Sequence, residues 1–141
     1  MPVFLWFDVG EFVVLIFRRF QRMPVAIHRF LFFSLLTFVL VMSLIPGEAD
    51  PSGFINDKVK HVLVFFMLTF VMEMLAYPSE KWGIRKPFWL MMFGVLIEVL
   101  QGQSGYRDFS LGDMVADGVG VVLFYAGLKS LQYFWIKKSE A

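Results

Sequence analysis

The sequence predicts an all-α, polytopic membrane protein in which four helices span a bilayer. Hydrophobic residues make up 58% of the 141 residues and aromatic residues 18%, whereas a soluble domain contains roughly 45–50% apolar residues with glycine included. The apolar residues occur in blocks close to the length of about 20 residues that a spanning helix needs. Basic residues gather in alternate connecting segments, as in multi-pass membrane proteins.

The composition excludes several classes of protein. Apolar surface is too abundant for a disordered chain, and its arrangement in long blocks excludes a soluble globular enzyme. The chain has no cysteine, so a disulfide framework, a thiolate nucleophile and a thiolate metal site are excluded as well. We find no internal repeat and no domain boundary within the membrane region, and we expect no nucleic-acid partner.

Residues 1–25 are predicted to form an amphipathic helix that lies in the membrane interface. Asp8, Glu11, Arg18 and Arg22 recur at helical spacing and form a polar stripe. The apolar side chains around this stripe are Phe4, Phe7, Phe12, Ile16 and Phe20. An interfacial helix of this kind places its arginines near anionic headgroups. A fifth span is less favoured, because two acids interrupt the apolar run.

Residues 26–141 are predicted to form a membrane domain of four spans. The spans cover about 26–46, 59–77, 84–101 and 111–136. The first stops at Pro46 and the second at Pro78, because proline does not continue a helix. The third span has a short uncharged run, and it reaches the required length only if Arg85 and Lys86 extend toward the interface.

The orientation follows from the distribution of lysine and arginine. Ten of the 13 basic residues fall on one side of the membrane in this arrangement. They are Arg18, Arg19, Arg22, Arg29, Lys81, Arg85, Lys86, Lys129, Lys137 and Lys138. The other side has Lys58, Lys60 and Arg107. Because basic segments stay on the inner side, the N-terminus and the C-terminus are both predicted to be cytoplasmic.

Polar side chains gather at the outer ends of the predicted spans. They are Asp57, Lys58 and His61 at the start of the second span, Glu98 and Gln101 at the end of the third, Arg107 and Ser110 in the following loop, and Asp113 and Asp117 at the start of the fourth. Three helix ends and one loop therefore bring polar groups to one depth. Since carboxylates within a membrane are costly and usually face a bundle interior or a water-filled cavity, we expect a functional site here.

Chemical roles can be assigned to these residues as expectations. His61 is the candidate acid or base at neutral pH. The other candidate catalytic residues are Asp57, Glu98, Asp113 and Asp117. The candidate substrate-binding residues are Lys58, Gln101, Arg107 and Ser110. Arg107 would meet an anionic group such as phosphate. We assign no metal ligand and expect no cofactor, with a divalent cation such as magnesium or calcium, held by the carboxylates, as the alternative.

Several of these residues also have a purely structural explanation. Asp57 is a candidate helix N-cap, and Lys58 a candidate anchor that extends to the interface. Ser110 and Asp113 fit a capping pair. Asp117 lies about 10 Å along the helix from Ser110, at 1.5 Å per residue. A simple cap therefore does not explain Asp117.

Two features outside this cluster also yield expectations. Glu73 lies toward the cytoplasmic end of the second span, where we expect it to extend to the interface or to pair with Lys81 or Arg85. Gly118 and Gly120 lie in the fourth span, where small residues permit close packing of helices.

Four segments, in this order and at these places relative to the spans, resemble a known family. They are Asp57-Lys58-Val59-Lys60-His61, Glu98-x-x-Gln101, Arg107-Asp108-x-Ser110-x-x-Asp113 and Gly120. Together they resemble the VanZ-like family of small membrane proteins, whose second span opens with Asp-Lys-x-x-His. The resemblance extends from about Phe30 to Leu128. The chain departs from the family at Asp117, where asparagine is usual.

The resemblance implies a four-span protein of the cell envelope, located in the plasma or inner membrane. The named member of the family is associated with low-level resistance to teicoplanin, a glycopeptide antibiotic. The family does not define a reaction, so the sequence leaves open whether the chain is an enzyme. We expect the site to bind, or act on, a membrane lipid or a lipid-linked envelope precursor at the outer face.

Two alternatives remain open at the level of sequence. One is a transporter or flippase-like protein, in which buried acids relay protons, although carriers usually place the site near the midplane between repeats. The other is a non-catalytic interaction module, in which the polar cluster is a structural clasp between helices. A homodimer or an envelope-protein partner would be compatible with either.

Overall fold

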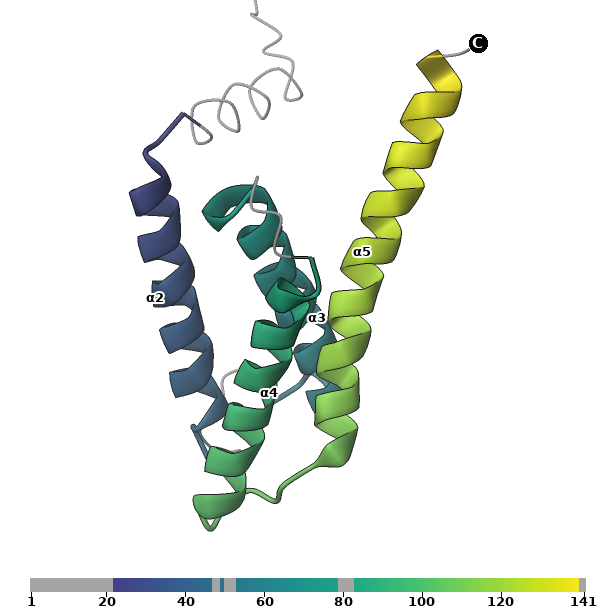
Figure 1. Cartoon of the computed structure of the whole chain (residues 1–141). Helices are drawn as coiled ribbons and strands as arrows, with labels where there is room; N and C mark the ends of the chain where they lie inside the picture. The colour runs from purple at the N-terminus through teal and green to yellow at the C-terminus, as the bar shows by residue number, and fades with distance from the viewer. Residues whose placement is uncertain (1–21, 47–48, 50–52, 79–82, 140–141) are drawn as a thin grey trace, which may run out of the picture.

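The computed structural model describes residues 22–46, 49, 53–78 and 83–139. Within these residues the chain forms four long helices and one π-helical turn, with no strand (Figure 1). The elements are α2 (Val25–Ser43), α3 (Asp57–Val71), η2 (Met72–Ala76), α4 (Arg85–Gln103) and α5 (Leu111–Ser139). The all-α prediction is therefore confirmed. Most of the interfacial helix predicted for residues 1–25 lies outside the described residues.

Three of these helical segments are long and apolar enough to cross a membrane. They are Val25–Ser43, Asp57–Ala76 and Leu111–Tyr133, with mean hydropathies of 2.1, 1.8 and 1.5. Their bounds lie close to those of the predicted first, second and fourth spans. These segments indicate a membrane protein. α4 covers the predicted third span but is less apolar, and it is not one of the three.

The helices run alternately up and down, so their ends form two groups (Figure 1). The C-termini of α2 and α4 and the N-termini of α3 and α5 lie together, at the lower end of Figure 1. We call this the site end. The N-termini of α2 and α4, η2 and the C-terminus of α5 lie toward the opposite end. This antiparallel order follows from the short connections between consecutive helices.

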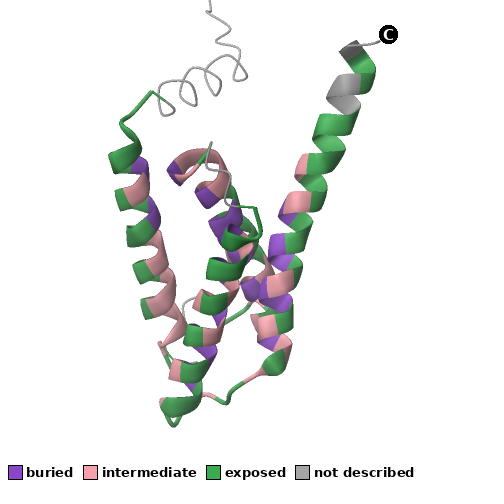
Figure 2. Cartoon of the chain, viewed as in Figure 1, coloured by how far each residue is buried: buried purple, intermediate pink, exposed green. Residues whose placement is uncertain are grey.

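The core lies where the four helices meet. Its buried apolar side chains are Phe32, Phe65, Leu68, Met72, Ala76, Leu90, Ile97 and Val121. Figure 2 shows buried residues along the inward faces of the helices and exposed residues along their outer faces. Many of the exposed residues are large and apolar, such as Phe30, Phe38 and Val122. An apolar outer surface of this kind is suited to lipid rather than to water.

The closest helix packing is between α3 and α5. A Cβ atom at Gly120 would collide with the backbone oxygen of Val62 and lie 3.0 Å from the backbone nitrogen of Phe66. Glycine therefore lets α5 approach the backbone of α3, which confirms the role predicted for Gly120. At Gly118 the nearest atom would be 3.8 Å away, an ordinary contact, so close packing does not require a glycine there.

A buried ion pair lies toward the opposite end of the bundle. Lys86 is 3% exposed, and its ammonium donates to Glu73 Oε2 at 2.6 Å and to the backbone oxygen of Tyr77 at 2.7 Å. The Tyr125 hydroxyl donates to Glu73 Oε1. Glu73 belongs to the π-helical turn, which closes with a bond from the Tyr77 nitrogen to the Met72 oxygen at 2.9 Å.

This pair corrects two sequence-based expectations. Lys86 does not extend toward the interface, and among the described residues the cation that binds Glu73 is Lys86 rather than Arg85. The alternative partner, Lys81, lies outside the described residues. The physical reason is helical periodicity. Lys86 shares one face of α4 with Leu90 at a spacing of four residues, and that face is turned into the bundle.

Candidate functional site

α3 begins with Asp57, but the residue that caps this helix is Asn56. Its side-chain oxygen accepts a bond from the backbone nitrogen of Lys58 at 3.0 Å. The expectation that Asp57 is the N-cap is therefore wrong, because the residue before it takes that position. The Asp57 carboxylate instead lies 3.5 Å from the Lys60 ammonium and 3.3 Å from a guanidinium nitrogen of Arg107.

Two polar side-chain contacts connect α3 to α5. The Lys58 ammonium lies 2.9 Å from Asp113 Oδ1. About one turn further into the bundle, His61 Nδ1 lies 2.7 Å from Asp117 Oδ1. Asp117 is fully buried and His61 is 9% exposed. The structure therefore brings these four predicted residues together, in two contacts that the sequence alone did not pair.

α4 supplies the two remaining helix-borne site residues. Glu98 is fully buried, and its Oε2 accepts a bond from the backbone nitrogen of Ser110 at 2.8 Å. The Ser110 hydroxyl in turn accepts from the backbone nitrogen of Asp113 at 3.2 Å, so the predicted capping role of Ser110 is confirmed. Gln101 donates to the backbone oxygen of Ser43 at 2.7 Å and thereby connects α4 to α2.

Two buried carboxylate oxygens have no hydrogen-bond partner among the described residues. They are Glu98 Oε1 and Asp117 Oδ2. An unpaired buried acceptor is unfavourable by about 1–3 kcal/mol, and such groups call for an explanation in function or in a bound molecule. Each of these two oxygens can therefore accept a hydrogen bond that no described residue donates.

Gly94 of α4 is a site residue that the sequence analysis missed. A Cβ atom at this position would collide with Asp117 Oδ2, and it would lie 3.1 Å from Cζ of Phe65. The absence of a side chain therefore makes room for the buried carboxylate. One signal was present in the sequence, since Gly94 lies four residues before Glu98 in an otherwise apolar helix and so shares its face.

A cavity of about 300 Å³ opens at the site end between α2, α3 and α4. Its polar lining residues are Ser43, Asp57, Lys60, His61, Gln101 and Arg107. Apolar side chains of α2, α3 and α4, including Phe38, Met42 and Leu63, line the rest. We call it the site cavity. Lys60 was not among the predicted site residues, although its spacing of three from Asp57 was a signal that the two side chains share a face.

The predicted site residues thus divide into two sets. Asp57, His61, Gln101 and Arg107 line the site cavity. The other five, which are not among its lining residues, are Lys58, Glu98, Ser110, Asp113 and Asp117. Lys58, Asp113 and Asp117 lie in the α3–α5 contacts, where Asp117 holds the lining residue His61. Glu98 of α4 holds Ser110 in the loop before α5.

One group within the site has the composition of a cation site. Asp57, His61 and Asp113 each offer a ligand atom, and these atoms lie within 4.8 Å of one another. Carboxylate oxygen and imidazole nitrogen are common ligands of divalent metals. Asp117 would support such a site, because a carboxylate on the second ring nitrogen commonly orients a ligating histidine.

Comparison of this chain with protein-family models, with curated proteins and with solved structures finds no match. The residues that line the site cavity, and those that position them, are therefore the features that indicate a function.

Proposed function

We propose that this chain is a VanZ-like, four-span protein of the plasma or inner membrane that binds, or acts on, a lipid or lipid-linked envelope precursor. The observation that carries the proposal is the mixed lining of the site cavity. Asp57, Lys60, His61 and Arg107 line it together with aliphatic and aromatic side chains. A cavity with an apolar body and a few convergent polar groups suits an amphiphile. Teicoplanin-type resistance would follow if the amphiphile is an envelope precursor.

In this proposal α4 also crosses the membrane, as the third of the four spans. Its 19 residues correspond to about 28 Å of helix at 1.5 Å per residue, close to the roughly 30 Å of a hydrocarbon core. Its charged residues do not oppose insertion, since Lys86 pairs with Glu73 and Glu98 accepts a bond from Ser110. Buried partners of this kind are what charges within a membrane require.

The proposed orientation places the site end outside the cell. Lys58, Lys60 and Arg107 lie in α3 and in the loop at this end. The basic residues of the opposite end are more numerous, and those described are Arg22, Arg29, Arg85, Lys86, Lys129, Lys137 and Lys138. Because the more basic side stays in the cytoplasm, the site cavity would face the outer leaflet.

The charges of the site cavity favour an anionic headgroup. Lys60 and Arg107 both contact Asp57, and all three line the cavity. A guanidinium binds phosphate through paired hydrogen bonds, and an incoming phosphate would draw Arg107 away from Asp57. His61 lines the same cavity with Nδ1 engaged by Asp117. Nε2 is then the nitrogen that can exchange a proton with a bound substrate.

A second candidate function has its own observation. The Lys58–Asp113 and His61–Asp117 contacts both connect α3 to α5. Polar contacts of this kind stabilise helix association in membranes, so the pairs would serve as the structural clasp of a non-catalytic module. On this interpretation Lys60 and Arg107 have no ligand, and their replacement affects neither lipid binding nor activity.

Binding of phosphatidic acid, a lipid with an exposed phosphate, separates these candidates. We expect Arg107→Gln to weaken binding of phosphatidic acid about tenfold, the equivalent of roughly 1.4 kcal/mol. The Asp57–Arg107 contact is partly exposed and contributes about 0–1 kcal/mol, so the variant should fold. Lys129→Gln, which removes an exposed charge from α5, is the matched control.

Native mass spectrometry of the purified protein would measure the bound lipid, with phosphatidylcholine as the zwitterionic comparison. Equal retention of phosphatidic acid by Arg107→Gln and by the unchanged chain would exclude the phosphate-binding role and favour the clasp.

The Asp57–His61–Asp113 group can be tested separately for a divalent cation. A cation that binds only the folded state raises stability, by about 2.7 kcal/mol at a concentration 100 times its dissociation constant. Magnesium, calcium and manganese should then raise the melting temperature of the unchanged chain but not that of Asp113→Asn. Asp108→Asn, in the exposed loop, is the control. If no ion shifts the melting temperature, the site acts without a metal.

A further inference from the structure

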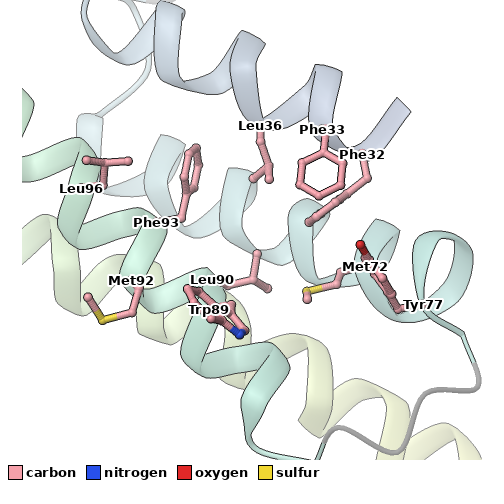
Figure 3. Close-up of a pocket in the computed structure, with 10 residues that line it drawn as sticks. All are labelled: Phe32, Phe33, Leu36, Met72, Tyr77, Trp89, Leu90, Met92, Phe93 and Leu96. Atoms are coloured by element: carbon pink, nitrogen blue, oxygen red, sulfur yellow. The ribbon is translucent and has the colours of Figure 1, made fainter. Parts of the chain in front are cut away.

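A second cavity, of about 510 Å³, lies between α2 and α4. Figure 3 shows apolar side chains of α2, η2 and α4 pointing into it, among them Phe32, Leu36, Leu90 and Phe93. None of its lining residues lines the site cavity. No role described above uses this space, which we call the α2–α4 cavity.

α2 is attached to the bundle near its two ends, and between these ends it borders the α2–α4 cavity, with Leu35, Leu36, Val39 and Leu40 half-buried against the core. Near one end, the Arg29 side chain donates to the backbone oxygen of Ala76 at 3.3 Å and lies 4.5 Å from the centre of the Tyr77 ring. At the other end, Gln101 donates to the backbone oxygen of Ser43.

The packing of α2 agrees with this description. His28 and Phe32 are the two residues of α2 that are buried, and both lie in its N-terminal half. From Phe33 to Ser43 every residue of α2 is exposed or half-buried. In a bilayer, the exposed side chains of this half of α2 would face hydrocarbon.

The mouth of the cavity opens sideways, toward the surroundings of the bundle. Phe33, Trp89 and Leu96 line the cavity and are 55%, 60% and 46% exposed. α2 is the most apolar of the three candidate spans, with a mean hydropathy of 2.1. At the depth of such a helix the surrounding medium consists of lipid chains, so hydrocarbon is what can enter the cavity from the side.

The shape of the cavity favours a chain over a partner helix. From Trp89 to Leu96 it extends about 10 Å along α4, at 1.5 Å per residue. A helix with its side chains is about 10–12 Å across, so a single turn of 5.4 Å would already occupy on the order of 500 Å³. A helix of a second copy, or of another protein, therefore does not fit along the length of the cavity.

We infer that the α2–α4 cavity binds a hydrocarbon chain of a membrane lipid. The two cavities are neighbours, since the rings of Phe93 in this cavity and Phe65 in the site cavity lie 6.4 Å apart. The inference does not depend on what the site cavity binds. A chain seated here would fill the space beside that aromatic pair and support the apolar wall of the site.

Photolabelling in phosphatidylcholine vesicles tests this inference. The probe is a phosphatidylcholine that carries a diazirine in the middle of one acyl chain, and labelled residues are identified by peptide mass spectrometry. We expect label on Leu90 and Phe93. Leu90 is 2% exposed and lines the cavity, so a lipid that only surrounds the bundle would not reach it.

A cavity-filling variant provides the comparison. Leu36→Trp should reduce labelling of Leu90 several-fold, because the larger side chain fills the cavity. Val41→Trp adds the same side chain to an exposed position on the same helix that lines neither cavity, and it should leave labelling unchanged. If Leu36→Trp does not fold, Met92→Trp at the mouth replaces it, since Met92 is already 42% exposed.

Other outcomes would overturn the inference. Label confined to outward residues such as Phe30 and Val41 would show that no chain enters the cavity. Crosslinks between two copies of the protein at Leu36 or Phe93 would show that a second copy covers it. Arg107→Gln should not change the labelling of Leu90. If phosphatidic acid does not bind at the site cavity, the labelling test of the α2–α4 cavity is therefore unaffected.

Discussion

His61 and Asp117 form a buried pair across the α3–α5 contact, with Nδ1 of the imidazole 2.7 Å from Oδ1 of the carboxylate. Asp117 is fully buried, and His61 also lines the site cavity. The carboxylate therefore lies behind the ring, on the side away from the cavity. Such an arrangement fixes the orientation of an imidazole, as in sites where a carboxylate holds a catalytic or ligating histidine.

The first prediction concerns this pair. Asp117→Asn keeps an oxygen that can accept a bond from His61, so the free energy of unfolding should fall by no more than about 1.5 kcal/mol. Asp117→Leu removes the acceptor and leaves His61 Nδ1 unpaired, which should lower it by about 1–3 kcal/mol. Thermal unfolding in detergent measures both. Unfolding of Asp117→Asn would contradict the prediction.

The second prediction compares two glycines of α5. Gly120→Ala should lower stability by about 1–3 kcal/mol, as overpacking generally does, because its Cβ would meet the α3 backbone at Val62 and Phe66. A Cβ atom at Gly127 would have open space around it, with no packing neighbour within 4 Å, and Gly127→Ala should raise stability by about 0.5–1 kcal/mol through helix propensity. Similar melting temperatures for the two variants would show that α3 and α5 are not in such close contact.

The third prediction tests the space that Gly94 leaves for Asp117. Gly94→Ala places a methyl group where Asp117 Oδ2 lies, so it should destabilise the chain and displace the carboxylate from His61. In an Asp117→Ala background the same change should be less harmful, with a coupling energy between about 0.5 and 3 kcal/mol. A double-mutant cycle on thermal stability measures that coupling, and purely additive effects would refute the contact.

The fourth prediction concerns the Glu73–Lys86 pair. Lys86→Met removes the cation that lies 2.6 Å from Glu73 Oε2, and loss of one partner of a buried pair is unfavourable by about 3–5 kcal/mol. Adding Glu73→Gln to Lys86→Met should restore much of the stability, because no unpaired charge then remains. Arg85→Met, next to Lys86 but exposed, is the control. Equal stabilities of Lys86→Met and Arg85→Met would mean that Lys86 is not buried in the membrane-embedded protein.

The fifth prediction concerns orientation, and the absence of cysteine makes it simple to test. Phe54→Cys, before α3 at the site end, and Ile84→Cys, before α4 at the opposite end, are at positions 86% and 82% exposed. With the site end outside, a membrane-impermeant maleimide should label Phe54→Cys in intact cells and Ile84→Cys only after permeabilisation. The reverse pattern would place the site cavity in the cytoplasm and remove the outer-leaflet substrate from the proposal.

Several features of this protein were predictable from local sequence. Apolar blocks bounded by Pro46 and Pro78 predicted α2 and α3 close to their actual bounds, because proline ends helices and apolar runs of this length form them. The grouping of polar residues at one end of the bundle was predictable as well, since alternate helix ends meet when connections are short.

Other features depended on how each helix is rotated about its axis. Lys86 was expected at the interface and is buried, and Asp57 was expected as a cap that Asn56 provides. α4 is apolar nearly all round, so no apolar stripe indicates which of its faces turns inward. Gly94 went unrecognised for the same reason, because its importance depends on Asp117, which lies on another helix.

By itself, the sequence determined where the helices lie, which segments are apolar enough for a membrane, and which end of the bundle gathers carboxylates, His61 and Arg107. These properties follow from composition and spacing along one chain. The tertiary structure alone decided that His61 meets Asp117, that Lys58 meets Asp113, and that an apolar cavity lies between α2 and α4. Such contacts are set by helix rotation and packing, which bring together side chains that are 55 or more residues apart in sequence.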